Sequence, residues 1–259
     1  MRTSKGYWAR PWDDAELEYL HANYATVPTK EIAVHLGRSN DAVYQRARIE
    51  GLKSRHRSGV NSLKPDYFKV IDTPMKAYLL GLYTADGCVS KNGQVILALA
   101  EKDRALVEAV RDELAPASRI SGYTTPTTVM VRFAVSSPGL VADLADHGVV
   151  NNKTLITRWP DGVPEHLEGS YVCGYFDGDG SLSTTSDGYP RWAVTAGCRP
   201  FLEAMQDHIK QRTGVRVGGP YRDKRTSSTW SIVQIGEPAR TIDAWTHSLV
   251  SGLYRKRLI

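Results

Sequence analysis

The chain contains two similar ten-residue phrases. GLYTADGCVS begins at Gly81 and GYFDGDGSLS begins at Gly174. When residues 78–90 are moved along the chain by 93 positions they fall on residues 171–183. The positions that keep the same residue are Tyr78 and Tyr171, Gly81 and Gly174, Asp86 and Asp179, Gly87 and Gly180, and Ser90 and Ser183. A duplication of this length predicts two similar half-domains in one chain.

Each phrase is predicted to be a helix that ends at its own aspartate. The residues before the acid are apolar or small, without proline, and Asp-Gly is a helix-stop signal. Small residues recur four positions apart, which leaves a stripe where a second backbone can approach closely. These residues are Gly81 and Ala85 in the first copy, and Gly174 and Gly178 in the second. If the helices pack along these stripes, Asp86 and Asp179 lie side by side.

Two carboxylates in that position need a positive partner. The C-terminal end of a helix is the negative end of its dipole, which disfavours an acid there by about 0.3 to 1 kcal/mol at an exposed site. Two close carboxylates also raise each other's pKa unless a cation lies between them. Mg²⁺ commonly takes one or two carboxylates together with phosphate oxygens and water. A single Asp-Gly pair is usually only a turn, but two in the same frame behind Gly-containing helices indicate a shared site.

YLLGLYTADG and YVCGYFDGDG resemble the paired motifs of single-chain LAGLIDADG homing endonucleases, with a similar layout from about Pro74 to the C-terminus. The resemblance implies an α+β, pseudo-twofold fold of two αββαββα halves, residues 74–160 and 161–259, with DNA-binding antiparallel sheets. Strand-like QVILALA, SRISGY and TVMVRFAV with helices at 102–114 and 139–147 permit this order in the first half. RWAVTAG, VRVGGPYR and TWSIVQIG with helices at 200–213 and 238–250 permit it in the second.

The same resemblance implies a site-specific endonuclease that hydrolyses phosphodiester bonds on both strands of DNA. Asp86 and Asp179 would hold Mg²⁺, or Mn²⁺ in its place, between the scissile phosphates. The backbone carbonyls of Ala85 and Gly178 are candidate further ligands. Metal-bound water would be the nucleophile, and the metal would stabilise the leaving oxygen.

Two lysines are candidate catalytic helpers. Lys153, in NNKT, and Lys256, in LYRKR, occupy comparable late positions in the two halves, where the family often has a lysine that polarises the water or the phosphate. A surface lysine or a phosphate anchor is the alternative for each. Thr84 replaces the earlier aspartate of the family pattern, which Asp177 retains, so we expect the two halves to differ at this point.

Basic residues lie in or beside the strands that this fold would place in the major groove. They are Arg132, Arg191, Arg216, Arg222, Lys224 and Arg225, with Tyr221 among them. Arginine and lysine there could read guanines or bind the phosphate backbone, and the residues alone leave both uses open.

Residues 1–55 are predicted to form a separate all-α domain of three short helices, at 12–24, 29–36 and 40–50. Thr29 and Ser39 are candidate N-caps, and Gly37 and Gly51 stand where helix ends favour positive φ. The apolar residues that would form its core are Leu17, Leu20, Ile32, Ala33, Leu36, Val43, Ala47 and Leu52.

The third of these helices carries a polar face that fits the DNA major groove. The face consists of Asp41, Tyr44, Gln45 and Arg48, and glutamine and arginine can make bidentate contacts to base edges. A solvated face of a helical bundle is the alternative. The run EIA…LGRS…AV…RAR resembles Myb/SANT-like helix-turn-helix modules, which implies that this helix binds DNA.

Residues 56–73 are predicted to be a basic linker. Three basic residues at or just before its start are candidate contacts to DNA phosphates, namely Lys53, Arg55 and Arg57. The stretch has no apolar period, so a solvated tether is the simpler reading.

Composition fits a nucleic-acid partner without requiring one. Lys and Arg number 33 against 28 Asp and Glu, a net charge of +5, with a pI near 9.0. No signal-peptide core or membrane-length apolar run is present, so we expect a cytoplasmic protein, bacterial or phage-encoded, with no membrane partner. The 3 cysteines form no CxxC pair and the 7 histidines lack ligand spacing, which speaks against zinc chemistry.

Because both halves occupy one chain, we expect a monomer that binds a long, asymmetric double-stranded DNA site. Two other functions stay open at this point. One is a non-cleaving DNA-binding transcription regulator on the same scaffold, and the other is an RNA maturase. The presence of both final acids, Asp86 and Asp179, favours the endonuclease.

Overall fold

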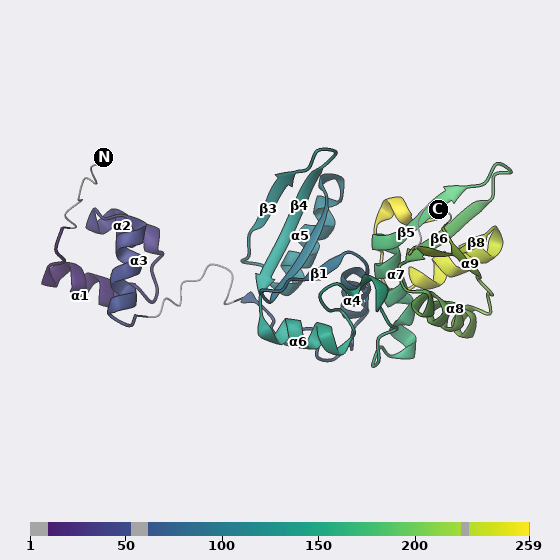
Figure 1. Ribbon diagram of the computed structural model, residues 1–259, viewed down its shortest axis with the longest axis horizontal. Helices are drawn as coiled ribbons and strands as arrows, with labels where there is room; N and C mark the ends of the chain where they lie inside the picture. Colours follow the sequence, from purple (N-terminus) through teal and green to yellow (C-terminus); the bar gives the residue numbers. More distant parts are fainter. Residues whose placement is uncertain (1–9, 53–61, 224–227, 259) are drawn as a thin grey trace, which may run out of the picture. The chain divides into compact units, whose positions relative to one another are not determined.

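The structure, a computed structural model, describes residues 10–52, 62–223 and 228–258. The chain divides into two units, Met1–Asn61 and Ser62–Ile259 (Figure 1). Each unit has its own hydrophobic core. Within the described ranges, no helix has the length and apolar character needed to cross a membrane.

The first unit contains α1 (Asp14–Asn23), α2 (Thr29–Leu36) and α3 (Asn40–Ile49). The Ser39 hydroxyl caps α3 by accepting from the backbone N–H of Ala42 at 3.2 Å. The N-cap of α2 is Pro28 and not Thr29, because Pro28 already has the extended backbone conformation that precedes the first turn. The buried residues are Leu20, Tyr24, Ile32, Ala33, Val43 and Ala47, with Leu36 and Leu52 partly buried against them.

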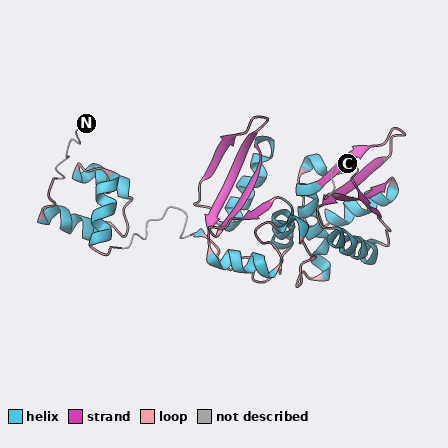
Figure 2. Ribbon diagram, in the orientation of Figure 1, coloured by secondary structure: helices cyan, strands magenta, loops and turns pink. Residues whose placement is uncertain are grey.

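The second unit repeats one order of elements, αββαββα. The first half runs through α4 (Pro74–Ala85), β1 (Gly87–Val89), β2 (Gln94–Ala100), α5 (Arg104–Leu114), β3 (Ile120–Thr124), β4 (Val129–Ser136) and α6 (Pro138–Asp146). The second runs through α7 (Glu168–Asp179), β5 (Gly180–Thr184), β6 (Pro190–Ala196), α8 (Arg199–Thr213), β7 (Gly218–Arg222), β8 (Trp230–Ile235) and α9 (Glu237–Thr246). This is the predicted α+β class, with two four-stranded antiparallel sheets (Figure 2).

Each sheet has one face covered by helices and one face left uncovered. The strand orders are β1-β2-β4-β3 and β5-β6-β8-β7. Helix α5 packs on the first sheet, and α8 and α9 pack on the second. Because side chains alternate along a strand, Val95, Leu97 and Leu99 of β2 are buried beneath α5 while the residues between them point the other way.

The largest differences from the sequence-based predictions concern the end of α9 and residues 62–73. Helix α9 ends at Thr246 instead of residue 250, because the side chains of Thr246 and His247 both bond the Asp243 carbonyl and close the last turn. Residues 62–73 are not a linker but part of the second unit. Tyr67 and Phe68 of this stretch are buried in its core.

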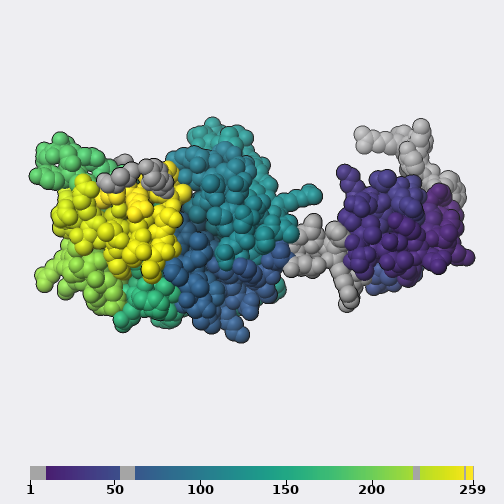
Figure 3. Space-filling model, turned by 180° about the vertical axis from the view of Figure 1, so that it is seen from behind, coloured from purple at the N-terminus to yellow at the C-terminus, as the bar shows by residue number. Residues whose placement is uncertain are grey.

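Helices α4 and α7 form the contact on which the second unit is built. They lie side by side between the two sheets (Figure 1), and the halves that they join abut over a continuous surface (Figure 3). A side chain at Gly81 would collide with the Tyr171 carbonyl and lie 2.8 Å from the Tyr175 nitrogen. One at Gly174 would collide with the Tyr78 carbonyl. The predicted small-residue stripes therefore bring the two backbones into direct contact.

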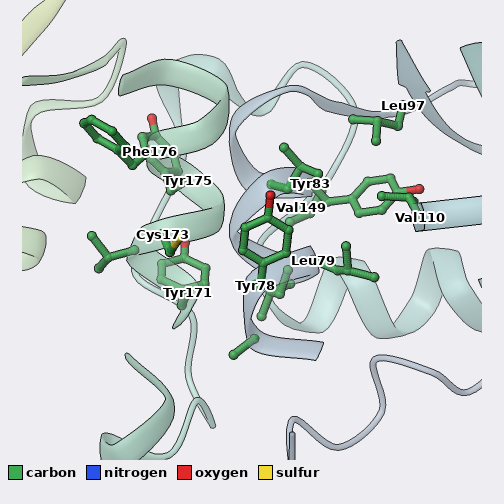
Figure 4. Packing of buried hydrophobic residues seen from close by; sticks show 14 of the residues in the cluster. Tyr78, Leu79, Tyr83, Leu97, Val110, Val149, Tyr171, Cys173, Tyr175 and Phe176 are labelled. Carbon is green, nitrogen blue, oxygen red and sulfur yellow. The ribbon is translucent and has the colours of Figure 1, made fainter. Parts of the chain in front are cut away.

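Aromatic side chains surround this backbone contact. Figure 4 shows Tyr78 and Tyr83 of α4 together with Tyr171, Tyr175 and Phe176 of α7 in the same core. These five side chains are all 5% exposed or less, so the two motif helices are buried on nearly every side. A helix surrounded in this way has little room to shift, and the positions of its end residues are correspondingly well fixed.

We expect Gly174→Ala to destabilise the protein by about 3 kcal/mol, because the added methyl meets backbone, which cannot rotate away. The matched control is Gly122→Ala in β3, where the methyl would meet only the Met130 carbonyl at 3.6 Å, an ordinary contact. Thermal unfolding of the two variants measures the difference. An equal melting temperature for both would contradict the close packing of α4 on α7.

Candidate functional site

The two motif acids lie at the ends of the packed helices. Asp86 is the C-cap of α4 and Asp179 is the last residue of α7. A side chain at Gly178 would contact Ala85 and would lie 3.1 Å from Oδ2 of Asp86. The absence of a side chain at Gly178 thus allows the Asp86 carboxylate to lie against the end of α7, beside Asp179. The structure brings together the two acids that the sequence singled out.

This neighbourhood makes both acids harder to ionise. The pKa of Asp86 is raised to about 6, first by burial and then by the negative charge of Asp179. The pKa of Asp179 is raised by burial, an effect that the Tyr175 hydroxyl, Lys153 and Lys256 oppose. A carboxyl pair of this kind has a strong electrostatic preference for a positive group.

Lys153 supplies part of that positive charge at the end of α4. It begins a short 3₁₀ turn, η3 (Lys153–Leu155), and is buried. Its Nζ donates to the carbonyls of Ala85, at 3.2 Å, and Gly87. A lysine there compensates the negative end of the helix dipole.

Lys256 does the same at the end of α7. It ends the turn η5 (Tyr254–Lys256), is buried, and donates to the carbonyls of Phe176, Asp177 and Gly178 at 3.2, 2.6 and 3.1 Å. Burial lowers the pKa of both lysines. The two lysines predicted as helpers therefore lie at the site, where each binds one of the carbonyls proposed as a metal ligand.

The pKa of each acid is lowered more by the lysine of the other half than by the lysine of its own half. Lys256 lowers the pKa of Asp86 more than Lys153 does, and Lys153 lowers that of Asp179 more than Lys256 does. Each lysine thus caps the motif helix of its own half, while Asp86 and Asp179 are each affected more by the lysine of the other half.

The halves differ at the earlier motif position. Oδ2 of Asp177 accepts from the Tyr78 hydroxyl and from the Leu253 backbone N–H, both at 2.7 Å, and so connects α7 to α4 and to the C-terminal segment. At the corresponding position of α4, the Thr84 hydroxyl only donates to the Leu80 carbonyl of its own helix, at 2.8 Å. The predicted asymmetry has a structural basis in these contacts.

An ion pair between distant segments also lies close to the site. Nε and Nη2 of Arg255 bond Oδ1 and Oδ2 of Asp103 at 2.9 and 2.6 Å. Neither residue is among the candidates predicted from the sequence. The two are separated by 152 positions, and no local pattern marks such a partner.

The donor set fits a hard divalent cation that shares its ligands with a substrate. Two carboxylates lie close together, and the described residues contain no group of three or more His, Cys, Asp or Glu side chains able to hold a metal. An all-protein zinc site needs more ligands than this, whereas Mg²⁺ accepts one or two carboxylates and completes its shell with water and phosphate oxygens.

The uncovered sheet faces carry some of the predicted DNA-binding residues. Arg132 pairs with Ala98 on the uncovered face of the first sheet, and Arg191 pairs with Ile235 on that of the second. Tyr221, 58% exposed, shares the second face. Arg216 is exposed just before β7.

Arg222, which is exposed, lies on the other side of β7 from Tyr221. It pairs with Trp230, whose ring lies on the helix-covered side, and its guanidinium lies 5.9 Å from the centre of that ring. The alternation of side chains along β7 is the reason, since Tyr221 takes the uncovered side. Lys224 and Arg225 lie outside the described residues.

In the first unit the predicted polar face of α3 is exposed throughout. Asp41, Tyr44, Gln45 and Arg48 all point to solvent, while Val43 and Ala47 are buried. Lys53, Arg55 and Arg57 lie outside the described residues.

Residues 73–143 match the family model described as "LAGLIDADG-like domain". This stretch is therefore similar to LAGLIDADG-like domains, and the second unit has a LAGLIDADG homing endonuclease-like fold. No curated protein sequence matches the chain.

Three solved structures illustrate the fold similarity. The homing endonuclease I-WcaI bound to its DNA recognition sequence has a TM-score of 0.50 and 12% identity, over 74% of this chain and 88% of that one. The LAGLIDADG meganuclease I-AabMI bound to uncleaved DNA has a TM-score of 0.46 and 13% identity, over 70% and 85%. The N-terminal LAGLIDADG domain of DUF199/WhiA has a TM-score of 0.45 and 15% identity, over 79% and 96%.

The raised pKa of Asp86 predicts that Asp86→Asn stabilises the metal-free protein at neutral pH. The folded chain holds this proton up to about pH 6, while the unfolded chain loses it near 3.8, so the free energy of unfolding falls as pH rises between these values. Asparagine carries no acidic proton, so the variant does not lose stability in this way as the pH rises. We expect a gain of about 1 kcal/mol at pH 7.5, because solvent reaches Asp86 and screens the effect, and a smaller gain at pH 4.5.

Urea unfolding with a metal chelator measures this gain. Asp187→Asn, which changes an exposed acid in the β5–β6 turn, is the control and should change stability equally little at both pH values. A loss of stability in Asp86→Asn at pH 7.5 would show that the acids do not repel.

Proposed function

We propose that this chain is a divalent-metal-dependent, site-specific DNA endonuclease that cuts both strands of one site. The observation that supports this most directly is the meeting of Asp86 and Asp179 at the ends of two helices in backbone contact, with Lys153 and Lys256 buried beside them. No single half contains both acids, so the site exists only where the halves meet.

In this proposal Asp86 and Asp179 hold Mg²⁺, for which Mn²⁺ can substitute. When bound, the metal supplies an activated water and stabilises the charge on the leaving oxygen. Lys153 and Lys256 hold the helix ends through the carbonyls that they bind, which fixes the acids against each other. Their positive charges also favour the ionised acids, which is the form that binds a cation.

The uncovered faces of the two sheets are the proposed DNA-binding surface, with Arg132 on one and Arg191 on the other. These arginines occupy different strands of their sheets, β4 and β6, so the two faces present different chemistry to the duplex. We therefore propose a long, asymmetric target. The structure of I-WcaI, whose fold is similar, is of that protein bound to its DNA recognition sequence.

We also propose that the first unit is a Myb/SANT-like helix-turn-helix module that adds affinity for DNA. The exposed face of α3 supports this, because Gln45 and Arg48 are free to reach base edges and phosphates. Since one chain contributes both acids, a monomer suffices for cutting both strands.

Selection of cleaved sites from a randomised duplex library in Mg²⁺ tests the nuclease. We expect cutting of a defined site by the parent, and a loss of at least about 10³-fold in rate in Asp86→Asn and Asp179→Asn with DNA binding retained. Asp187→Asn again serves as the control. Tight binding of a defined duplex without nicking or cutting in Mg²⁺ or Mn²⁺ would refute the nuclease and favour the regulator.

The double variant Gln45→Ala, Arg48→Ala tests the first unit. We expect weaker binding of the selected site by about tenfold, with the rate of cutting of bound DNA unchanged, because α3 lies in a different unit from the acids. Lys30→Ala, which removes one exposed cation from α2, is the control and should cost less. Equal affinities of parent and double variant, measured at one salt concentration, would remove the helix-turn-helix from the proposal.

A further inference from the structure

The turn that carries Lys256 is held from three directions. The Leu253 backbone N–H bonds Asp177 of α7, Arg255 bonds Asp103, and Lys256 bonds three carbonyls at the end of α7. Of these anchors only Asp103 belongs to the first half, where it ends the 3₁₀ turn η2 (Glu101–Asp103) directly after β2.

The Asp103–Arg255 pair has the geometry of a strong ion pair. Both guanidinium contacts are parallel N–H···O bonds to the two oxygens of one carboxylate, which is the most favourable arrangement for arginine. The Asp103 side chain is 8% exposed and that of Arg255 is 42% exposed. The carboxylate is thus fixed in the protein while the arginine reaches it from the surface.

Among the residues that the structure describes, the turn that carries Lys153 forms no ion pair corresponding to this one. The residue before Lys153 is Asn152, which carries no charge and cannot form an ion pair. Asn151 bonds the Val89 carbonyl within the same half, at 2.8 Å. Close contact with the second half comes from packing, where Gly197 leaves room for the Thr154 carbonyl.

We propose that Asp103 is a positioning residue that holds Lys256 in place through Arg255. In this way a residue of the first half fixes the lysine that caps the motif helix of the second half. The inference rests on the proposed nuclease. Its consequence is that loss of the pair slows one strand cut more than the other, because Lys153 and its turn have no such anchor to lose.

Lysine labelling tests the positioning without any use of DNA. The full chain is treated with an acetylating reagent, and labelling of Lys256 and Lys153 is followed by peptide mass spectrometry. In Asp103→Asn we expect Lys256 to label about tenfold faster than in the parent, with Lys153 unchanged, because the turn opens more often when its charged bond is lost.

Three further variants complete the labelling experiment. Arg255→Gln removes the other partner of the ion pair and should also make Lys256 label faster. Because Arg255 is exposed, this variant tests the proposal even if Asp103→Asn does not fold. Arg255→Lys keeps the charge but loses the paired geometry, and should give an intermediate rate. Glu101→Gln removes an exposed carboxylate of the same turn, the partner of Arg104, and should change nothing. Unchanged Lys256 labelling in folded Asp103→Asn and Arg255→Gln would overturn the positioning role.

Strand-resolved cleavage tests the consequence for the reaction. A supercoiled plasmid with the selected site is incubated with Mg²⁺, and each strand is followed with its own end label. We expect about tenfold accumulation of DNA nicked in one strand for Asp103→Asn, and normal double-strand cutting for Glu101→Gln. Faster Lys256 labelling with equal slowing of both strands would overturn the role in the reaction. If the parent cuts no DNA, the proposed nuclease fails, while the labelling still decides whether Asp103 positions Lys256.

Discussion

The backbone contact between α4 and α7 is the constraint on which the second unit depends. It requires glycine at 81 and 174, since a side chain at either would occupy the place of a carbonyl on the facing helix. The contact sets how far apart the helix ends lie, and Asp86 and Asp179 are at those ends. Core packing and the geometry of the candidate site therefore have one common origin in the sequence.

This arrangement has an electrostatic cost that the lysines reduce. Two carboxylates meet at the negative ends of two helix dipoles, a combination that disfavours the folded state. Lys153 and Lys256 bind the last carbonyls and lower the pKa values of the acids, but burial lowers the pKa of the lysines themselves. The carboxylates of the site are thus already held in place, so binding of the proposed cation would need little reorganisation.

The fold was predictable where it rests on local patterns. The repeated phrase gave the two motif helices, the small-residue stripes gave their contact, and alternating apolar residues gave the paired sheets. The polar face of α3 followed from helical spacing in the same way. In each of these cases the signal is built from short patterns, each of which lies within one helix, one strand or one copy of the repeated phrase.

Other features depended on partners that are distant in sequence. Residues 62–73 look like a linker because their few apolar residues show no period, yet Tyr67 and Phe68 enter the core of the second unit. The residues alone do not show which side of β7 faces the helices, so the sequence could not separate the side of Arg222 from that of Tyr221. The ion pair of Asp103 with Arg255 joins residues far apart in the chain, and only the assembled fold brings them together.

The alternation of side chains along the strands separates two kinds of residue. On β6, Trp192 and Val194 point into the core while Arg191 and Thr195 point away from it. Changes on the outward positions leave the packing of the inward ones untouched. A lineage of such chains can therefore vary the outer surface of its sheets under selection while the interior stays nearly constant. The two-residue repeat of the strand makes this possible, because it places the two sets of residues on opposite faces.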